Sequence, residues 1–271
     1  MNNREKLKDK QRIVVKVGTS SLIHKATGNI NLFRLEKLVR VLTDLHNSGK
    51  DVILVSSGAI GVGFKALGLE NRPTSLPMKQ ACSAVGQGQL MMIYQKLFAE
   101  YNQGSAQILI TKETMLNDER RYNAKNTFEE LLKLGVIPIV NENDSVSYKE
   151  IESEDRLFGD NDMLSAVVAV LCRARHLVIL SDIDGFYDHD PRLYPNAKLI
   201  EQIDTIDDSV YALAGGAGSR RGTGGMRTKL QAAALATSQG TDTIVTNGKH
   251  PEALYDIVKG LHAGTLFPGK I

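Results

Sequence analysis

Short runs of apolar residues alternate with amphipathic stretches along most of the chain. The runs are rich in Val, Ile and Leu and end at polar or glycine-containing turns; they cover residues 12–17, 52–55, 107–110, 136–140, 176–180 and 243–245. Between them, apolar residues recur at helical spacing in residues 32–45, 78–101, 128–134, 163–172 and 230–238. We expect helix 78–101 to be broken near Gly86 and Gly88, because glycine weakens a helix interior.

The apolar runs lack the apolar–polar alternation of half-exposed strands, so they predict strands that are buried on both faces. Helices between such strands supply the cover. We therefore expect an α/β protein of one domain, residues 1–271, in which a mostly parallel central sheet lies between two helical layers, an αβα sandwich. Its two lobes should cover residues of about 1–145 and about 160–271.

Polar residues follow the ends of several predicted strands. In a parallel sheet with right-handed crossovers the carboxyl ends of the strands share one edge, where open α/β sheets bind ligands. The residues expected there are Lys16, Ser57, Gly58, Lys112, Asn141, Asp144, Ser181 and Asp182. This grouping favours an enzyme over a scaffold.

Composition narrows the class of protein. With 33 Lys and Arg against 31 Asp and Glu, the net charge of +2 gives no electrostatic reason to expect nucleic acid or a membrane surface as a partner. The longest apolar run, 166–172, is too short to span a bilayer, and the charged N-terminus does not resemble a signal peptide. Cys82 and Cys172 lack CxxC partners, so we expect free, buried thiols in a soluble cytoplasmic protein. The six histidines show no zinc-ligand spacing.

Two segments are candidates for phosphate binding. Lys16 ends an apolar run and is followed by Gly18, so its ammonium and nearby N–H groups could meet a phosphate. Residues 222–229 place glycines directly before a helix and Lys229 in its first turn, where N–H groups and the helix dipole favour an anion. The alternatives are a solvent-exposed lysine and a mobile surface loop over 215–225. Neither segment is a P-loop, and no GxGxxG follows the first strand.

Two clusters of acids and amides complete the candidate chemistry. Asp160, Asn161 and Asp162 open a helix; capping explains one of them, and an acid could orient the lysine ammonium groups or hold Mg²⁺ through water. Residues 141–144 (NEND) suit recognition of a substrate's ammonium and carboxylate groups, unless they form an ordinary Asx-rich turn. The Ser-Ser-Gly-Ala turn 56–59 offers a hydroxyl and N–H groups to a carboxylate, or is simply a helix cap.

No nucleophile motif is present: the chain has no GxSxG, no HRD or DFG signature and no Cys/His pair. Paired lysines, a glycine loop and acids suit phosphoryl transfer, in which catalysis rests mainly on positioning and charge neutralisation.

These residues lie in motifs that resemble the amino acid kinase family. The motifs are VVKVGTSSL, VSSGAIGVG, VNENDSV, FGDND, LSDIDGFY and GTGGMRTKLQAA, in the family's order and spread over residues 12–267. Within the family, GTGGMxTK together with GDND is similar to the members that phosphorylate L-glutamate. The resemblance implies an eight-stranded sheet and transfer of the γ-phosphoryl group of ATP, with Mg²⁺, to the glutamate side chain, the first step of proline synthesis.

The resemblance also implies roles for individual residues. Lys16 and Lys229 would stabilise the migrating phosphoryl group, and Asp162 would orient them. Glutamate would be held by Ser57, Asp144 and Asn161. The residues expected to bind ATP are Lys16, Ser181, Asp182, Thr223, Gly224, Gly225, Met226, Arg227, Thr228 and Lys229, with Mg²⁺ on the phosphates.

Further expectations concern partners and regulation. The resemblance implies a homo-oligomer, a tetramer, and transfer of the product to a glutamyl phosphate reductase. It also implies proline as a feedback inhibitor. Residues 145–158 are rich in Ser, Glu and Lys and should form a hairpin or flexible flap, of which residues 149–158 are longer than in some relatives. Many members carry an additional C-terminal domain of the PUA type, which we expect this chain to lack. Two alternatives stay open: a kinase for acetylglutamate, aspartate, carbamate or uridylate, and a non-catalytic nucleotide or amino-acid sensor.

Overall fold

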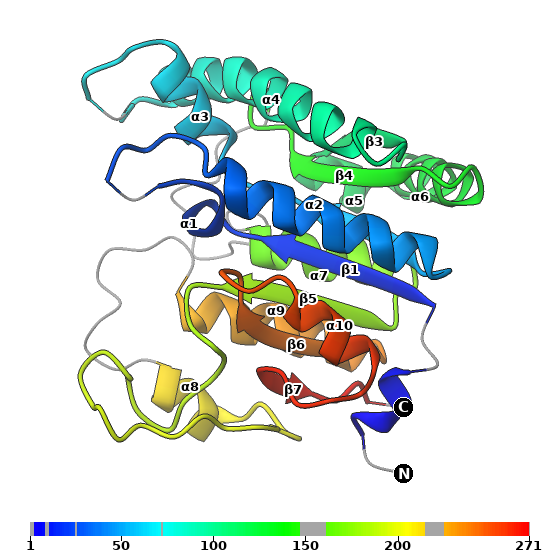
Figure 1. Cartoon of the computed structure of the whole chain (residues 1–271), viewed down its shortest axis with the longest axis vertical. Coiled ribbons are helices and arrows are strands. Elements are labelled where there is room, and N and C mark those ends of the chain that lie inside the picture. The colour runs from blue at the N-terminus through cyan, green and yellow to red at the C-terminus, as the bar shows by residue number, and fades with distance from the viewer. Residues whose placement is uncertain are drawn as a thin grey trace.

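The computed structural model describes residues 3–8, 11–24, 26–71, 73–146, 161–214 and 225–270. Their strands form one sheet in the order β3-β4-β2-β1-β5-β6-β7 (Figure 1). The strands are β1 (Arg12–Val17), β2 (Asp51–Val55), β3 (Ser105–Ile110), β4 (Ile137–Glu142), β5 (His176–Ser181), β6 (Asp242–Asn247) and β7 (Thr265–Phe267). All pairings are parallel except that between β6 and β7. The six predicted strands are confirmed. The expectation that all of them are buried on both faces is wrong for β3, in which only Ile110 is buried, because β3 lies at the edge of the sheet.

The last strand was not predicted. At three residues, β7 is too short to show a periodic pattern, and it is held at the sheet edge by antiparallel pairing with β6. The described residues contain seven strands, one fewer than the eight that the family resemblance implies. The expected hairpin or flap over 145–158 falls almost entirely outside the described residues.

Helices cover both faces of the sheet, as predicted. In Figure 1, α2, α4 and α10 lie in front of the strands and α6, α7 and α9 lie behind them. The helices are α1 (Thr19–Leu22), α2 (Leu32–Asn47), α3 (Ala59–Ala66), α4 (Leu76–Ala99), α5 (Lys112–Leu116), α6 (Asp118–Lys133), α7 (Asn161–Leu171), α8 (Asp208–Ala214), α9 (Met226–Ser238) and α10 (Ala253–Val258), with a 3₁₀ turn at Glu5–Leu7. Within the described ranges, no helix combines the length and apolar character that a membrane span requires.

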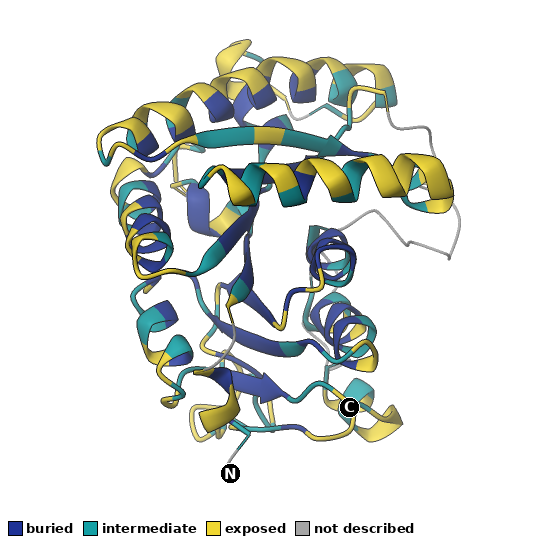
Figure 2. Ribbon diagram, turned by 90° about the vertical axis from the view of Figure 1, so that its right-hand side faces the viewer, coloured by how far each residue is buried: buried dark blue, intermediate teal, exposed yellow. Residues whose placement is uncertain are grey.

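The central strands are buried on both faces (Figure 2). Every residue of β5 is buried, and so is every residue of β1 after Arg12. Successive side chains of a strand point to opposite faces, so Val15 packs into the core under α2 and α4 while Val14 packs into the core under α7 and α9. Cys82 and Cys172 are free and buried, as expected, and burial raises the pKa of Cys172 to about 12.

The predicted break in helix 78–101 is wrong, because α4 runs without interruption from Leu76 to Ala99. Gly86 of this helix instead allows close packing of α4 against α3. A Cβ at Gly86 would lie 1.8 Å from the carbonyl oxygen of Ala59 in α3, and a Cβ at Gly63 would lie 1.8 Å from the carbonyl oxygen of Cys82. The two helices therefore approach backbone to backbone, which fixes the turn between β2 and α3.

We expect Gly86→Ala to lower the free energy of unfolding by about 1–3 kcal/mol or more, because the added methyl group overlaps a backbone atom that cannot move by itself. Gly88→Ala is the matched control, since a Cβ there meets nothing within 4 Å. That substitution should stabilise the protein by about 0.5–1 kcal/mol. Urea denaturation of both variants measures the difference, and equal effects would contradict the close packing of α3 on α4.

Candidate active site

One carboxylate lies between two lysine ammonium groups at the carboxyl edge of the sheet. Lys16 comes from β1, Asp162 from the first turn of α7, and Lys229 from the first turn of α9. Lys16 Nζ lies 2.5 Å from Asp162 Oδ1, and Lys229 Nζ lies 3.0 Å from Asp162 Oδ2. Three segments that are distant in the sequence therefore meet at one point, and we call these residues the lysine–aspartate cluster.

The lysine–aspartate cluster is shielded from water. Exposure is 6% for Lys16, 7% for Lys229 and 0% for Asp162. Burial by itself would raise the pKa of Asp162, but the two ammonium groups outweigh it and hold this pKa below its ordinary value. Two positive charges and one negative charge leave an excess positive charge, which a bound anion would neutralise.

Open space beside the Lys16 ammonium comes from the glycine that follows β1. A Cβ at Gly18 would lie 3.4 Å from Lys16 Nζ and 4.0 Å from Ser20 Oγ. Because Gly18 has no side chain, a phosphate oxygen could occupy this volume and reach both groups. The turn after β1, predicted to bind phosphate, therefore adjoins the Lys16 ammonium group.

The start of α9 adds backbone donors to the same place. Gly225 is the N-cap and provides no side-chain cap, so the N–H groups of Met226 and Arg227 have no acceptor within the helix. Thr228 Oγ1 lies 3.2 Å from Asp162 Oδ2, and the Arg227 guanidinium lies 5.7 Å from the centre of the Tyr211 ring. Thr223, Gly224 and most of the glycine-rich loop 215–225 lie outside the described residues.

The residues predicted to bind the acceptor adjoin this cluster on the β2 side. Asn161 Nδ2 donates to the Ser56 carbonyl oxygen at 2.6 Å. Ser57 Oγ donates to the Val17 carbonyl oxygen at 3.0 Å and accepts from Thr19 Oγ1 at 3.3 Å. The ends of β1 and β2 and the start of α7 are thereby linked directly.

The α3 N-terminus lies next in the chain after Ser57. Gly58, its N-cap, has φ of +99°, a conformation that favours glycine, and makes no side-chain cap. The first-turn N–H groups of α3 therefore lack acceptors within the helix, and the helix dipole adds partial positive charge. This end of α3 can take a carboxylate.

Two polar residues of α4 hold the end of β4, and sequence analysis missed both. Ser83 Oγ donates to Asp144 Oδ2 at 2.9 Å, and Gln87 Oε1 accepts from Asn141 Nδ2 at 2.8 Å. Ser83 and Gln87 are four residues apart, so they share a face of the helix. Two polar residues at this spacing in an apolar stretch were the signal that could have found them.

Asp144 is a partly buried carboxyl group. Burial raises its pKa above the ordinary value, and the hydrogen bond from Ser83 only partly offsets this effect. A cation beside Asp144 would favour its ionised form, so the position suits a substrate ammonium group.

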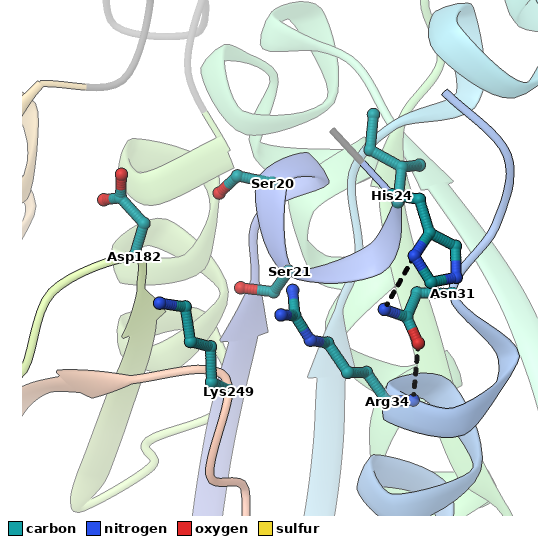
Figure 3. Close-up of a pocket in the computed structure, with 8 residues that line it drawn as sticks. Ser20, Ser21, His24, Asn31, Arg34, Asp182 and Lys249 are labelled. Carbon is teal, nitrogen blue, oxygen red and sulfur yellow. Dashed lines mark hydrogen bonds between the residues drawn. The ribbon is translucent and has the colours of Figure 1, made fainter. Parts of the chain in front are cut away.

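A cavity of about 300 Å³ opens on the other side of β1. Figure 3 shows that its lining comes from α1, α2 and the ends of β5 and β6. The polar and charged lining residues are Ser20, Ser21, His24, Asn31, Arg34, Asp182 and Lys249. Asp182 was a predicted nucleotide residue, and its neighbour Ser181 ends β5 and accepts from Gly248 N at 2.8 Å. Arg34 and Lys249 were missed, because nothing in their local sequence distinguishes them from other surface cations.

A family model described as "Amino acid kinase family" matches residues 11–247. The chain belongs to the amino acid kinase family. Membership of the amino acid kinases confirms the resemblance seen in the motifs.

Curated relatives within the amino acid kinases carry the name glutamate 5-kinase. One from Clostridium perfringens is 53% identical over 267 residues and is covered over 98% of each chain. One from Listeria innocua is 51% identical, covering 98% of this chain and 96% of the relative. One from Enterococcus faecalis is 50% identical, covering 97% of each. The chain therefore spans nearly the whole length of these relatives.

Solved structures of more distant amino acid kinases share the fold. UMP kinase from Ureaplasma parvum has a TM-score of 0.66 at 17% identity, and carbamate kinase from Giardia lamblia bound to AMP-PNP has a TM-score of 0.66 at 16% identity. Both alignments cover 96% of this chain and 99% of the other. At such identities the likeness establishes the fold alone.

We expect Asp162→Asn to lower the free energy of unfolding by about 3–5 kcal/mol, because it leaves two buried ammonium groups without their counter-charge. Adding Lys16→Met to this variant should recover part of the loss, since one of the two repelling charges is then gone. Chemical denaturation of the single and double variants measures the coupling. A double variant less stable than Asp162→Asn would contradict the electrostatic account.

Proposed function

We propose that the chain transfers the γ-phosphoryl group of ATP to the side-chain carboxylate of L-glutamate. The product is L-glutamyl 5-phosphate, the first intermediate of proline biosynthesis. The observation that carries the proposal is the lysine–aspartate cluster, which lies between the predicted acceptor residues and the predicted nucleotide residues. Relatives of about 50% identity that are named glutamate 5-kinase support the choice of acceptor over other substrates of the family.

The chemistry fits a site without a general base. A glutamate side chain has a pKa of about 4.3, so it is ionised at neutral pH and needs no proton removed. The obstacle is repulsion between this carboxylate and the polyphosphate. Lys16 and Lys229 place positive charge at the transfer point and Asp162 orients them, so the site stabilises charge that develops during transfer.

The acceptor side complements a free amino acid. Asp144 Oδ1 and Asn161 Oδ1 are acceptors without a partner in the described part of the chain, and they suit an α-ammonium group. Ser57 lies beside the N-terminus of α3, whose N–H groups suit a carboxylate. We assign glutamate binding to the lobe of about residues 1–145, completed by Asn161.

The nucleotide side lies in the lobe of about residues 160–271. We assign ATP binding to Lys16, Ser181 and Asp182 and to residues 223–229, which include Thr223 and Gly224. In the described ranges no three Asp, Glu, His or Cys side chains gather into a metal site, so Mg²⁺ would be held mainly by phosphate oxygens. Asp182 lies in the cavity of Figure 3 and would hold the ion through water.

We also propose that the chain forms a homo-oligomer, a tetramer, through α4. Met78, Val85 and Met92 recur every seven residues on its outer face, with exposures of 44%, 37% and 63%. Such a stripe is typical of a helix that packs against another protein surface.

The product, an acyl phosphate, is hydrolytically labile, so a glutamyl phosphate reductase would take it up in the cytoplasm. Proline, the pathway's end product, would act as inhibitor.

A hydroxamate assay tests the acceptor. With ATP, Mg²⁺ and hydroxylamine, L-glutamate should give glutamyl hydroxamate, whereas N-acetylglutamate, aspartate and carbamate should give none. Equal turnover of N-acetylglutamate would refute the assignment.

Lys16→Met should lower kcat at least a thousandfold while glutamate binding, measured by calorimetry, stays within about threefold, because the charge acts on the transferring group. The substitution also breaks the buried ion pair with Asp162, so a loss of stability is expected as well. Rates measured well below the melting temperature of the variant separate the two effects, and an unchanged kcat would refute the role of Lys16 in transfer.

The raised pKa of Asp144 predicts the pH dependence of glutamate binding. As pH falls through this pKa, Asp144 becomes neutral and loses its attraction for the substrate ammonium, so KM for glutamate should rise at a higher pH than an ordinary Asp would give. Ser83→Ala removes the hydrogen bond that lowers the pKa, so it should move this rise to still higher pH. Initial rates between pH 4.5 and 8 measure the shift, and an unchanged profile in Ser83→Ala would contradict it.

A further inference from the structure

The orientation of three side-chain amides beside the site is fixed by the backbone. The Ser56 carbonyl can only accept a hydrogen bond, so Asn161 must turn Nδ2 toward it, at 2.6 Å. The Glu142 N–H can only donate, so Asn141 must turn Oδ1 toward it, at 3.0 Å. Asn161 Nδ2 then also donates to Asn141 Oδ1 at 3.0 Å, which is consistent with both assignments.

The hydrogen bonds of Asn161 and Asn141 to the backbone determine which way the side-chain amide of Gln87 is oriented. Since Asn141 Oδ1 is used by two donors, Asn141 Nδ2 faces α4 and donates to Gln87 Oε1 at 2.8 Å. Gln87 therefore cannot exchange the places of its oxygen and nitrogen without losing this bond. Its Nε2 carries two protons and has no partner among the described residues. Gln87 is only 8% exposed, yet its Nε2 is not one of the fully buried polar atoms that lack a partner, so this nitrogen keeps an accessible surface at which a ligand can meet it.

The place of Gln87 relative to the lysines indicates which part of a ligand it meets. Lys16 lies on β1, Ser56 follows β2 and Asn141 lies on β4, in the spatial order β4-β2-β1. Neighbouring strands are about 4.8 Å apart, so the end of β4 is roughly 10 Å from the transfer point. An acceptor whose reacting carboxylate lies near Lys16 would place its other end near Gln87 and Asp144.

We propose that Gln87 is a substrate-binding residue whose Nε2 donates a hydrogen bond to the α-carboxylate of the amino-acid acceptor. Asp144 Oδ1 and Asn161 Oδ1 are acceptors for the α-ammonium group, and Gln87 supplies a donor for the adjacent carboxylate. Together they match the charge pattern of a free α-amino acid. This inference rests on the proposed function and adds to it a determinant of substrate recognition.

Two variants separate substrate binding from a purely structural role. Gln87→Glu keeps an acceptor for Asn141 but replaces the donor by a charge that repels a carboxylate. Gln87→Met removes both functions and adds no charge. If Gln87 binds the α-carboxylate, KM for L-glutamate should rise more than tenfold in Gln87→Glu and by a smaller factor in Gln87→Met, with KM for ATP unchanged. If Gln87 only holds Asn141, KM for L-glutamate should rise more in Gln87→Met than in Gln87→Glu, and that result overturns the proposal.

The substrate can be varied in the same assay. L-Glutamate α-amide (isoglutamine) keeps the reacting carboxylate and replaces the α-carboxylate by a neutral amide. Gln87→Glu should shift the ratio of kcat/KM for glutamate over the α-amide at least tenfold toward the α-amide. The matched control is Gln95→Glu, which adds the same charge on the exposed face of α4 and should leave the ratio unchanged. An unchanged ratio in Gln87→Glu refutes the inference, whereas a wild-type protein inactive on both acceptors refutes the proposed function instead.

Discussion

The site depends on keeping two lysines and one aspartate charged in a place from which water is excluded. An isolated buried ammonium group would lose its proton or destabilise the fold, and Asp162 prevents this by bonding to both Lys16 and Lys229. The same bonds hold β1, α7 and α9 together at the carboxyl edge of the sheet. The contacts that stabilise this edge of the fold are therefore the same contacts that position the charges proposed to act in transfer.

Helix α4 links the two halves of this arrangement. Gly86 of α4 and Gly63 of α3 allow the two helices to approach backbone to backbone, which places the free N–H groups of α3 beside Ser57. The inner face of α4 carries Ser83 and Gln87 to the end of β4, and its outer face is an apolar stripe. A second copy packed on that stripe would contact the same helix that carries Ser83 and Gln87. Association of copies and substrate affinity would then both depend on α4.

The proposed acceptor site is specified by the hydrogen-bond polarity of its side chains. Backbone groups of residues 56 and 142 set the orientation of Asn161 and Asn141, and those amides in turn set Gln87. What remains unpaired in this part of the chain is two acceptors and one donor, which is the complement of an ammonium next to a carboxylate. A backbone-anchored arrangement of this kind costs little reorganisation when the substrate binds.

The sequence by itself determined the sheet, the two helical layers and the edge at which the candidate site residues gather. The uninterrupted apolar runs predicted strands buried on both faces, which holds for the central strands but not for the edge strand β3. The parallel connections then bring Lys16, Asn141 and Asp182 to one edge. It also placed glycines beside both lysines. What it could not give was any contact that depends on helix packing. Gly86 was interpreted as a helix break because local propensity favours one, yet contact with α3 decides its role. Gln87 and Lys249 were missed, since what singles them out is their position beside the strand ends, which only the tertiary structure brings together.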